Sequence, residues 1–257
     1  MVAQTTMERN TYESAALDYA QRGLRVFPLH GIGRDGCTCR SATCSKAGKH
    51  PRTPNGFKDA TTDADQIRAW WQQWPDANIG IATGRESGLV VVDVDPRHGG
   101  TLEAIGGCPT TATVQTGGGG WHLYFAYPKD SDIPSSSNRI AQGIDVRADG
   151  GYIVAAPSQH MSGNTYVWEA DMPLAPLPAQ LAERMTSTKA VASKPAALQR
   201  IETAEDAHYW LAKALEQVST DGQPRNTTGF WLACQLRDSG VSEEAAWESM
   251  VAYAGQV

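Results

Sequence analysis

The sequence has no apolar run that approaches the roughly 18 residues needed to cross a membrane. Its first ten residues are polar and lack the apolar core of a secretory signal. From these two absences we expect a cytoplasmic protein with no membrane partner. The length of 257 residues, of which 41% are hydrophobic, fits a globular protein with one large domain and one smaller domain.

The chain also lacks an overall excess of basic residues. It has 22 lysines and arginines against 28 acidic residues, a net charge of −6, whereas nucleic-acid-binding proteins are often basic. The exception is local, because residues 34–58 contain six basic side chains and one acid, Asp35. Such an island suits contact with phosphate, although a solvated loop has the same composition. The six basic residues are Arg34, Arg40, Lys46, Lys49, Arg52 and Lys58.

Evenly paired cysteines are missing as well. There are five, and three of them fall within eight positions, which fits a metal site better than disulfides. Residues 30–56 contain few large apolar side chains, so this stretch requires another source of order. Zinc takes four sulfur or nitrogen ligands tetrahedrally. The sequence offers His30 as a substitute fourth ligand, and free thiols on a mobile loop are the alternative. The four candidate zinc ligands are Cys37, Cys39, Cys44 and His50.

Residues 88–95 read Gly-Leu-Val-Val-Val-Asp-Val-Asp, the pattern of a buried strand that ends in two carboxylates. Alternate side chains of a strand share a face, so Asp93 and Asp95 are expected on one face with Cα atoms roughly 6–7 Å apart. Two carboxylates at the end of an apolar strand repel each other and are costly to desolvate. A divalent cation between them would remove both costs, and a simple polar turn at Pro96 is the alternative.

Four consecutive glycines, ending at Gly120, join two expected strands over 111–116 and 121–127. Glycine allows backbone N–H groups to approach a phosphate closely, so Gly119 and Gly120 are candidates for phosphate contact. A flexible hairpin tip is the alternative. His122 lies just inside the second strand and is a candidate site residue because it follows this loop.

A third carboxylate stands on an expected strand over 143–147, where Asp145 and Arg147 share one face. A carboxylate beside a fixed guanidinium suits a site for a metal and a triphosphate. A surface ion pair is the alternative interpretation.

The remaining pattern mixes helices with short strands. Apolar spacing predicts helices over 11–23 and 63–74, the second capped by Thr62 or Asp63 and carrying a tryptophan stripe that belongs to the core. Polar composition predicts a loop over 128–142, and the sequence becomes helical from residue 201. Further strands are expected over 24–29, 78–83, 152–156 and 165–168.

Taken in order, these stretches resemble the bifunctional primase-polymerase (Prim-Pol) domain of the archaeo-eukaryotic primase superfamily, found in replication proteins of phages and plasmids. The resemblance covers about residues 14–180. It is carried by residues 56–63, the Trp70-Trp71 pair, residues 78–84, 90–95, 117–125 and 143–147, and the following Gly-Tyr-Ile-Val-Ala-Ala-Pro-Ser.

The resemblance implies an α+β fold. It would have a mixed sheet with a core like the RNA-recognition motif, flanking helices, a zinc-binding insertion over 30–56 and a small C-terminal helical domain. The acidic pair of the family falls on Asp93 and Asp95, and its third acid falls on Asp145. Its S-x-H motif falls on Gly120-Trp121-His122, where glycine replaces the serine. The active site is expected on the open face of the sheet.

The resemblance also implies an activity, template-directed nucleotidyl transfer from NTPs or dNTPs on single-stranded DNA, including primer synthesis. Two Mg²⁺ or Mn²⁺ ions would be held by the three acids, and a Zn²⁺ ion would be structural. His122 and Arg147 would contact the triphosphate, assisted by Gly119 and Gly120. Lys58 is a further candidate for nucleotide contact.

The expected organisation is a flexible N-terminus over 1–13, a catalytic domain over 14–180, a linker over 181–200 and a helical primase module over 201–257. A helicase can follow in the full-length chain. Three other classes stay open on sequence grounds. They are a metal-dependent nuclease using the same acids, a non-catalytic module that binds single-stranded nucleic acid, and a zinc-stabilised adaptor protein.

Overall fold

The computed structural model describes residues 2–106, 110–186, 204–220 and 241–256, with short helical pieces at 228–229, 232–233 and 235–236. The helices are α1 (Val2–Gln21), α2 (Ala64–Gln73), α3 (Ala179–Thr186), α4 (Ala204–Thr220) and α6 (Glu243–Gln256). The 3₁₀ turns are η1 (Gly56–Asp59), η2 (Arg85–Ser87), η3 (Pro96–His98) and η4 (Glu103–Ile105). The strands are β1 (Val26–Leu29), β2 (Ile32–Gly33), β3 (Gly36–Cys37), β4 (Asn78–Ala82), β5 (Leu89–Val94), β6 (Thr113–Gln115), β7 (Trp121–Ala126), β8 (Ser136–Ala141), β9 (Ile144–Arg147), β10 (Tyr152–Ala155), β11 (Val167–Ala170) and β12 (Ala175–Pro176).

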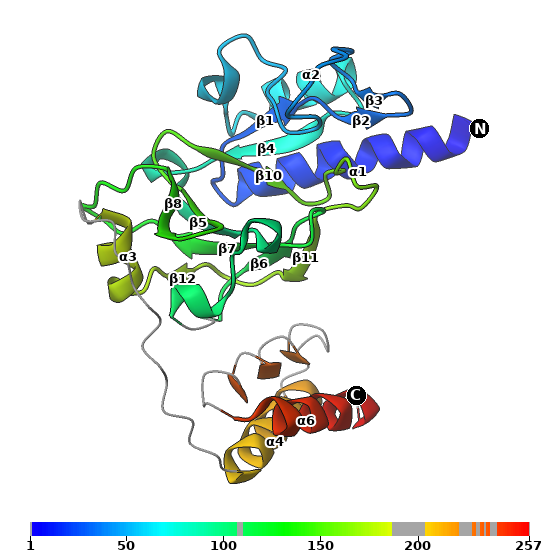
Figure 1. Cartoon of the computed structure of the whole chain (residues 1–257). Coiled ribbons are helices and arrows are strands. Elements are labelled where there is room, and N and C mark those ends of the chain that lie inside the picture. The colour runs from blue at the N-terminus through cyan, green and yellow to red at the C-terminus, as the bar shows by residue number, and fades with distance from the viewer. Residues whose placement is uncertain are drawn as a thin grey trace.

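Most strands belong to two sheets (Figure 1). The smaller sheet has the antiparallel order β1-β4-β10. The larger sheet has the order β11-β6-β7-β5-β9-β8, and β12 pairs in parallel with β7. Strands β2 and β3 form a separate short ribbon. This mixed sheet with flanking helices is the α+β architecture predicted from the sequence.

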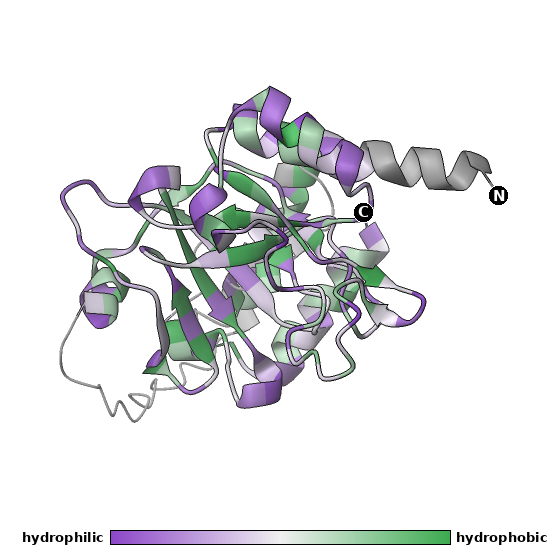
Figure 2. Cartoon of the chain, turned by 90° about the horizontal axis from the view of Figure 1, so that it is seen from above, coloured by the Kyte–Doolittle hydropathy of each residue, from purple (hydrophilic) through white to green (hydrophobic). Residues whose placement is uncertain are grey.

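Strand β5 is the centre of the larger sheet, and its two faces enter different hydrophobic cores. Leu89 and Val91 pack into a core shared with β1, β4, β10, α1 and α2. Val90, Val92 and Val94 pack into a second core, which α3 covers. In Figure 2 the strands are mostly hydrophobic, whereas the surrounding turns are largely hydrophilic. The alternation predicted for this stretch is therefore confirmed over residues 89–94, where the strand ends.

Helix α2 forms as its sequence predicts. The side chain of Asp63 caps the first turn by accepting hydrogen bonds from the N–H groups of Asp65 at 2.9 Å and Gln66 at 3.4 Å. Trp71 is only 2% exposed, and Trp70 and Trp74 pack against the same core. The tryptophan stripe is thus core.

Two segments differ from the sequence-based expectation. Strand β8 forms within 128–142, where a loop was predicted. It is an edge strand, paired with β9 alone, and only Ile140 is buried, so its polar composition hid it. Helix α3 occupies the start of the predicted linker because Leu181 and Met185, four residues apart, are both buried in the second core. Residues 187–203 lie outside the described part of the chain.

The two ends of the chain are helical. Helix α1 begins at Val2, earlier than the predicted start near residue 11, and residues 2–10 contain no glycine or proline to interrupt it. Helices α4 and α6 share a third core that includes Ala207, Ala214 and Tyr253. Within the described residues, every helix is too short or too polar to span a bilayer.

Candidate functional site

Asp93 occupies the middle of the site because β5 lies between β7 and β9. In the antiparallel register, Asp93 is directly opposite His122 on β7 and Asp145 on β9. Residues paired in this way lie on one face with Cα atoms about 4.5–5.5 Å apart. The fold therefore brings three predicted site residues from three separate segments to adjacent positions on one sheet face.

Arg147 joins this face two residues after Asp145. Its Nη2 atom lies 2.6 Å from Oδ2 of Asp145 and 4.0 Å from Oδ2 of Asp93. The Asp145 carboxylate also accepts hydrogen bonds from the Ser137 hydroxyl at 3.2 Å and the Asn138 N–H at 3.1 Å. One guanidinium thus faces both carboxylates and compensates their charge.

Asp95 has different surroundings, because β5 ends at Val94 and Asp95 caps the turn η3. Its carboxylate accepts hydrogen bonds from the Arg97 backbone N–H at 3.0 Å and from Nη2 of Arg97 at 2.9 Å. Nδ1 of His98 lies 2.9 Å away. The Arg97 guanidinium, helped by His98, holds the pKa of Asp95 at about 2, so this side chain is ionised at neutral pH.

His122 is a buried member of the site, 5% exposed, with its Nε2 atom 3.6 Å from Oδ1 of Asp93. Burial lowers the pKa of His122, so the ring is neutral at pH 7. Its Nδ1 atom has no hydrogen-bond partner among the described residues. A buried polar atom without a partner is rare and costly, which is typical of a side chain held in place for a ligand.

A pocket of about 380 Å³ is lined by Asp93, Asp95, His122 and Arg147, whereas Asp145 does not line it. Residues of both sheets bound it, since Asp93 and His122 come from the larger sheet and Tyr152 from β10. The site is thus a pocket bounded by both sheets, and it lies over the face of the larger sheet that carries Asp93 and His122. Its charged lining consists of Asp93, Asp95, Lys46, Lys49, Arg97 and Arg147. This excess of cations suits a polyanion.

The glycine connection between β6 and β7 places the hairpin close to the end of β5. A Cβ atom on Gly120 would lie 2.2 Å from the carbonyl oxygen of Val94. The two N–H groups predicted to meet a phosphate are otherwise engaged, because Gly119 donates to the carbonyl oxygen of Thr116 at 2.9 Å and Gly120 to its Oγ1 at 3.0 Å. In this structure Gly120 allows close packing against Val94, and the N–H groups of both glycines stabilise the turn.

Lys58 lies on η1, is exposed, and does not line the pocket. The basic island contributes Lys46 and Lys49 to the pocket in its place. Lys49 is half-buried there, and its burial lowers the pKa of the ammonium group.

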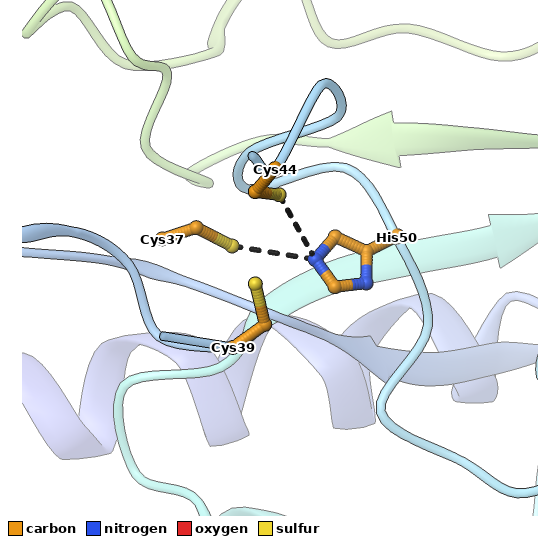
Figure 3. A group of neighbouring side chains, drawn as sticks. All are labelled: Cys37, Cys39, Cys44 and His50. Atoms are coloured by element: carbon orange, nitrogen blue, oxygen red, sulfur yellow. Dashed lines mark hydrogen bonds between the residues drawn. The ribbon is translucent and has the colours of Figure 1, made fainter. Parts of the chain in front are cut away.

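The cysteine motif forms a compact cluster (Figure 3). One ligand atom from each of Cys37, Cys39, Cys44 and His50 lies within 4.8 Å of the other three. Nε2 of His50 is 3.3 Å from Sγ of Cys37 and 3.5 Å from Sγ of Cys44. Sulfur and nitrogen ligands around tetrahedral zinc lie about 3.5 Å apart, so these atoms fit a zinc ion. Among the described residues, no other group of three or more His, Cys, Asp or Glu side chains brings its ligand atoms within 4.8 Å of one another.

His30 lies next to this cluster without joining it. Its ring stacks on His50 with centroids 4.3 Å apart, and its Nδ1 atom lies 3.2 Å from Oγ1 of Thr38. Between the two histidines that the sequence offered, the geometry favours His50 as the fourth ligand.

Sequence reasoning did not identify Arg97 as a site residue, and it singled out Lys58, whereas Lys49 is the lysine of the two that lines the pocket. Arg97 carried a local signal, because Pro96 begins a turn directly after the acidic pair and folds the next side chain back onto Asp95. Tyr166, which also lines the pocket, carried none, since it comes from a distant part of the chain.

The fold and the pocket together define a class of protein. In this class a mixed sheet places carboxylates, a histidine and several cations around one pocket that suits a polyanion such as a nucleotide. A family model described as "Bifunctional DNA primase/polymerase, N-terminal" matches residues 16–180, well over half of the chain. The chain therefore belongs to this bifunctional DNA primase/polymerase family, which implies a nucleotidyltransferase-type enzyme with DNA and nucleotides as substrates. No curated protein matches the chain.

Proposed function

We propose that this chain is the DNA primase and DNA polymerase of a phage or plasmid replication protein. It would make primers on single-stranded DNA and extend them with NTPs or dNTPs. The observation that carries the proposal is the register of three adjacent strands, which aligns His122, Asp93 and Asp145 on one face beside a cationic pocket.

In this proposal Asp93, Asp95 and Asp145 hold Mg²⁺ or Mn²⁺, because these ions prefer hard oxygen ligands. When bound, such ions activate a 3′-hydroxyl and stabilise the leaving pyrophosphate. Support comes from Arg147, whose Nη2 atom faces the carboxylates of both Asp93 and Asp145. Two of the three acids thus already lie within reach of one positive charge.

The chain's own cations would serve the triphosphate. Arg97 and Arg147 pair with carboxylates in this structure, and their planar guanidinium groups match phosphate oxygens equally well. Metal binding at the carboxylates would release both arginines toward the nucleotide. His122, neutral and buried, would donate one hydrogen bond to a phosphate oxygen.

Residues outside the pocket have supporting roles in the proposal. Zinc bound by Cys37, Cys39, Cys44 and His50 would be structural. Residues 14–180 would form the catalytic domain. Residues 201–257 would help to bind the template and the initiating nucleotide, and the full-length protein could carry a helicase.

The test is incorporation of labelled dNTPs on single-stranded DNA, primed and unprimed, in Mn²⁺ with and without NTPs. We expect the wild type to synthesise and extend primers. The Asp93→Asn variant keeps the side-chain size, and loss of a metal ligand should slow incorporation at least about 100-fold. Its melting temperature should stay close to that of the wild type.

Three results would redirect the proposal. Wild-type incorporation by Asp93→Asn would remove the acid from catalysis. Degradation of labelled DNA without any nucleotide, lost in Asp93→Asn, would assign the same acids to a nuclease. Binding of single-stranded DNA with neither activity would indicate a non-catalytic module.

A further inference from the structure

The zinc-type cluster and the pocket share one short loop. Lys46 and Lys49 lie between two ligands of the cluster, Cys44 and His50. Both lysines also line the pocket that contains Asp93. The same seven-residue stretch therefore closes the metal cluster and contributes two ammonium groups to the pocket.

The backbone of this loop is also anchored by two side chains outside the cluster, Tyr152 of β10 and Asn78 of β4. The Tyr152 hydroxyl donates to the carbonyl oxygen of Lys49 at 3.0 Å, and Nδ2 of Asn78 donates to that of Gly48 at 2.9 Å. Gly48 has a φ of +74°, and a Cβ atom there would lie 2.8 Å from the Ile32 side chain. With the cluster closed, the loop is held both by the ligands Cys44 and His50 and by these two hydrogen bonds, which fixes where the lysine side chains begin.

These two lysines differ from the other cations of the pocket. Arg97 is paired with Asp95 at 2.9 Å and Arg147 with Asp145 at 2.6 Å. Among the described residues, neither Lys46 nor Lys49 has a carboxylate oxygen within 4.0 Å of its ammonium nitrogen. Lys49 interacts with Asp93 and Asp95 only at longer range, and a pocket lined by four cations and two carboxylates suits an anion supplied from outside.

We propose that Lys46 and Lys49 bind the triphosphate of the incoming nucleotide, and that metal occupancy of the cysteine cluster holds them in position. Metal binding and nucleotide binding are then coupled, and each strengthens the other by the same factor. This inference rests on the proposed function, since it names the ligand of the same pocket. It adds that the cluster, described so far as structural, sets nucleotide affinity.

The first experiment measures binding of dATP with Mg²⁺ to the full chain by calorimetry, without template. Lys49→Ala should weaken binding about tenfold or more, because a charge-assisted contact is lost. Lys46→Ala should have a smaller effect, since Lys46 is exposed and Lys49 is half-buried. Lys129→Ala is the matched control, an exposed lysine outside the pocket, and should bind dATP like the wild type.

The second experiment is a cycle of zinc removal and lysine substitution. Removal of zinc by a zinc-selective chelator, with Mg²⁺ still present, should weaken dATP binding to the wild type. The factor should be similar to the one produced by the double substitution Lys46→Ala/Lys49→Ala. In the double variant, zinc removal should have little further effect. Zinc content is followed by mass spectrometry and the fold by circular dichroism. Equal loss of affinity in both backgrounds would overturn the inference, as would wild-type affinity in Lys49→Ala.

The reverse measurement covers the case in which the zinc-free chain unfolds. Release of zinc to a chromogenic chelator should be slower with saturating dATP in the wild type, and unaffected by dATP in the double variant. Release that ignores dATP in the wild type would also overturn the inference.

None of these readouts requires turnover. A chain that fails to incorporate nucleotides but passes the cycle would reject only the proposed function. If the chain is an active polymerase but its dATP affinity is unchanged by the lysine substitutions and by zinc removal, only the coupling is rejected.

Discussion

At the scale of single residues, the two carboxylates of the acidic motif have unequal surroundings. Asp93 lies on a strand between His122 and Arg147, whereas Asp95 lies in a turn that Arg97 closes. Any cation that binds Asp95 must compete with a guanidinium bonded through two atoms. In the proposed mechanism Arg97 would therefore oppose metal binding at Asp95, and metal binding would free the Arg97 guanidinium to contact phosphate.

This arrangement predicts an acid-range titration. The pKa of Asp95 is held at about 2, below its ordinary 3.8, so the Asp95–Arg97 interaction stabilises the fold above pH 3.8 and is lost as pH falls toward 2. Arg97→Gln should raise the pKa of Asp95 toward the ordinary value, measured by NMR titration of the carboxyl carbon. The stability of this variant should depend less on pH across the same window.

A suitable control is Arg68→Gln, which removes an exposed ion pair with Asp65 elsewhere. It should leave the Asp95 titration unchanged. An Asp95 that still titrates near its wild-type midpoint in Arg97→Gln would show that another group lowers its pKa.

The sequence was informative for residues whose position follows from strand alternation. Asp93, His122 and Asp145 were identifiable because each lies on a recognisable strand, and pairing then fixes their common face. The basic island included Lys49 but did not single it out, and Arg97 was missed, because the path of a loop determines which of its residues enters a pocket. That path depends on distant contacts such as Tyr152 with the Lys49 carbonyl.

At the scale of elements, the β6–β7 hairpin shows two distinct uses of glycine. Gly119 has a φ of +87° and open space around the position of a Cβ atom, so glycine is needed there for its backbone conformation. Gly120 lies against the Val94 carbonyl, so its requirement is steric. The absence of a side chain at Gly120 determines how closely the hairpin approaches the acidic end of β5.

The two requirements predict different costs. Gly119→Ala should lower the free energy of unfolding by about 1 kcal/mol, the cost of a left-handed conformation for alanine. Gly120→Ala should cost more, up to about 3 kcal/mol, because a backbone oxygen cannot turn aside. Urea denaturation measures both. An equal or reversed ranking would show that the hairpin can shift away from β5.

Edge elements were the least predictable ones. Strand β8 is polar because it pairs on one side only, and α3 lies in a segment whose alanine and proline content suggested a linker. In both cases a few buried side chains, Ile140 in β8 and Leu181 and Met185 in α3, determine the outcome. Composition averaged over ten or more residues conceals such sparse contacts, whereas the fully buried strand β5 was clear.

At the scale of the whole molecule, hydrophobic packing is divided. The two cores that flank β5 draw on residues up to Met185, and the core of α4 and α6 draws on residues from Ala207 onward. No described residue belongs to both groups. Separate cores are expected to fold as separate units.

We therefore expect a fragment of residues 11–186 to unfold cooperatively, with the midpoint that the full chain shows for this part. It should also retain zinc and bind dATP with unchanged affinity. Synthesis of primers on unprimed DNA should fall in the fragment more than extension of existing primers does, measured in parallel. A fragment that loses dATP affinity would place part of the pocket in the C-terminal helices.

The register of β5 has an effect on folding as well as on the site. If β5 shifted by a single residue against β7 and β9, each of its side chains would move to the other face of the sheet. Asp93 would then enter the second hydrophobic core, which α3 covers. Burying an ionised carboxylate there costs a large amount of free energy. The charge of Asp93 therefore disfavours every register except the observed one. We therefore expect Asp93→Val to weaken the preference for a single register, so that this variant aggregates more readily than the wild type on refolding.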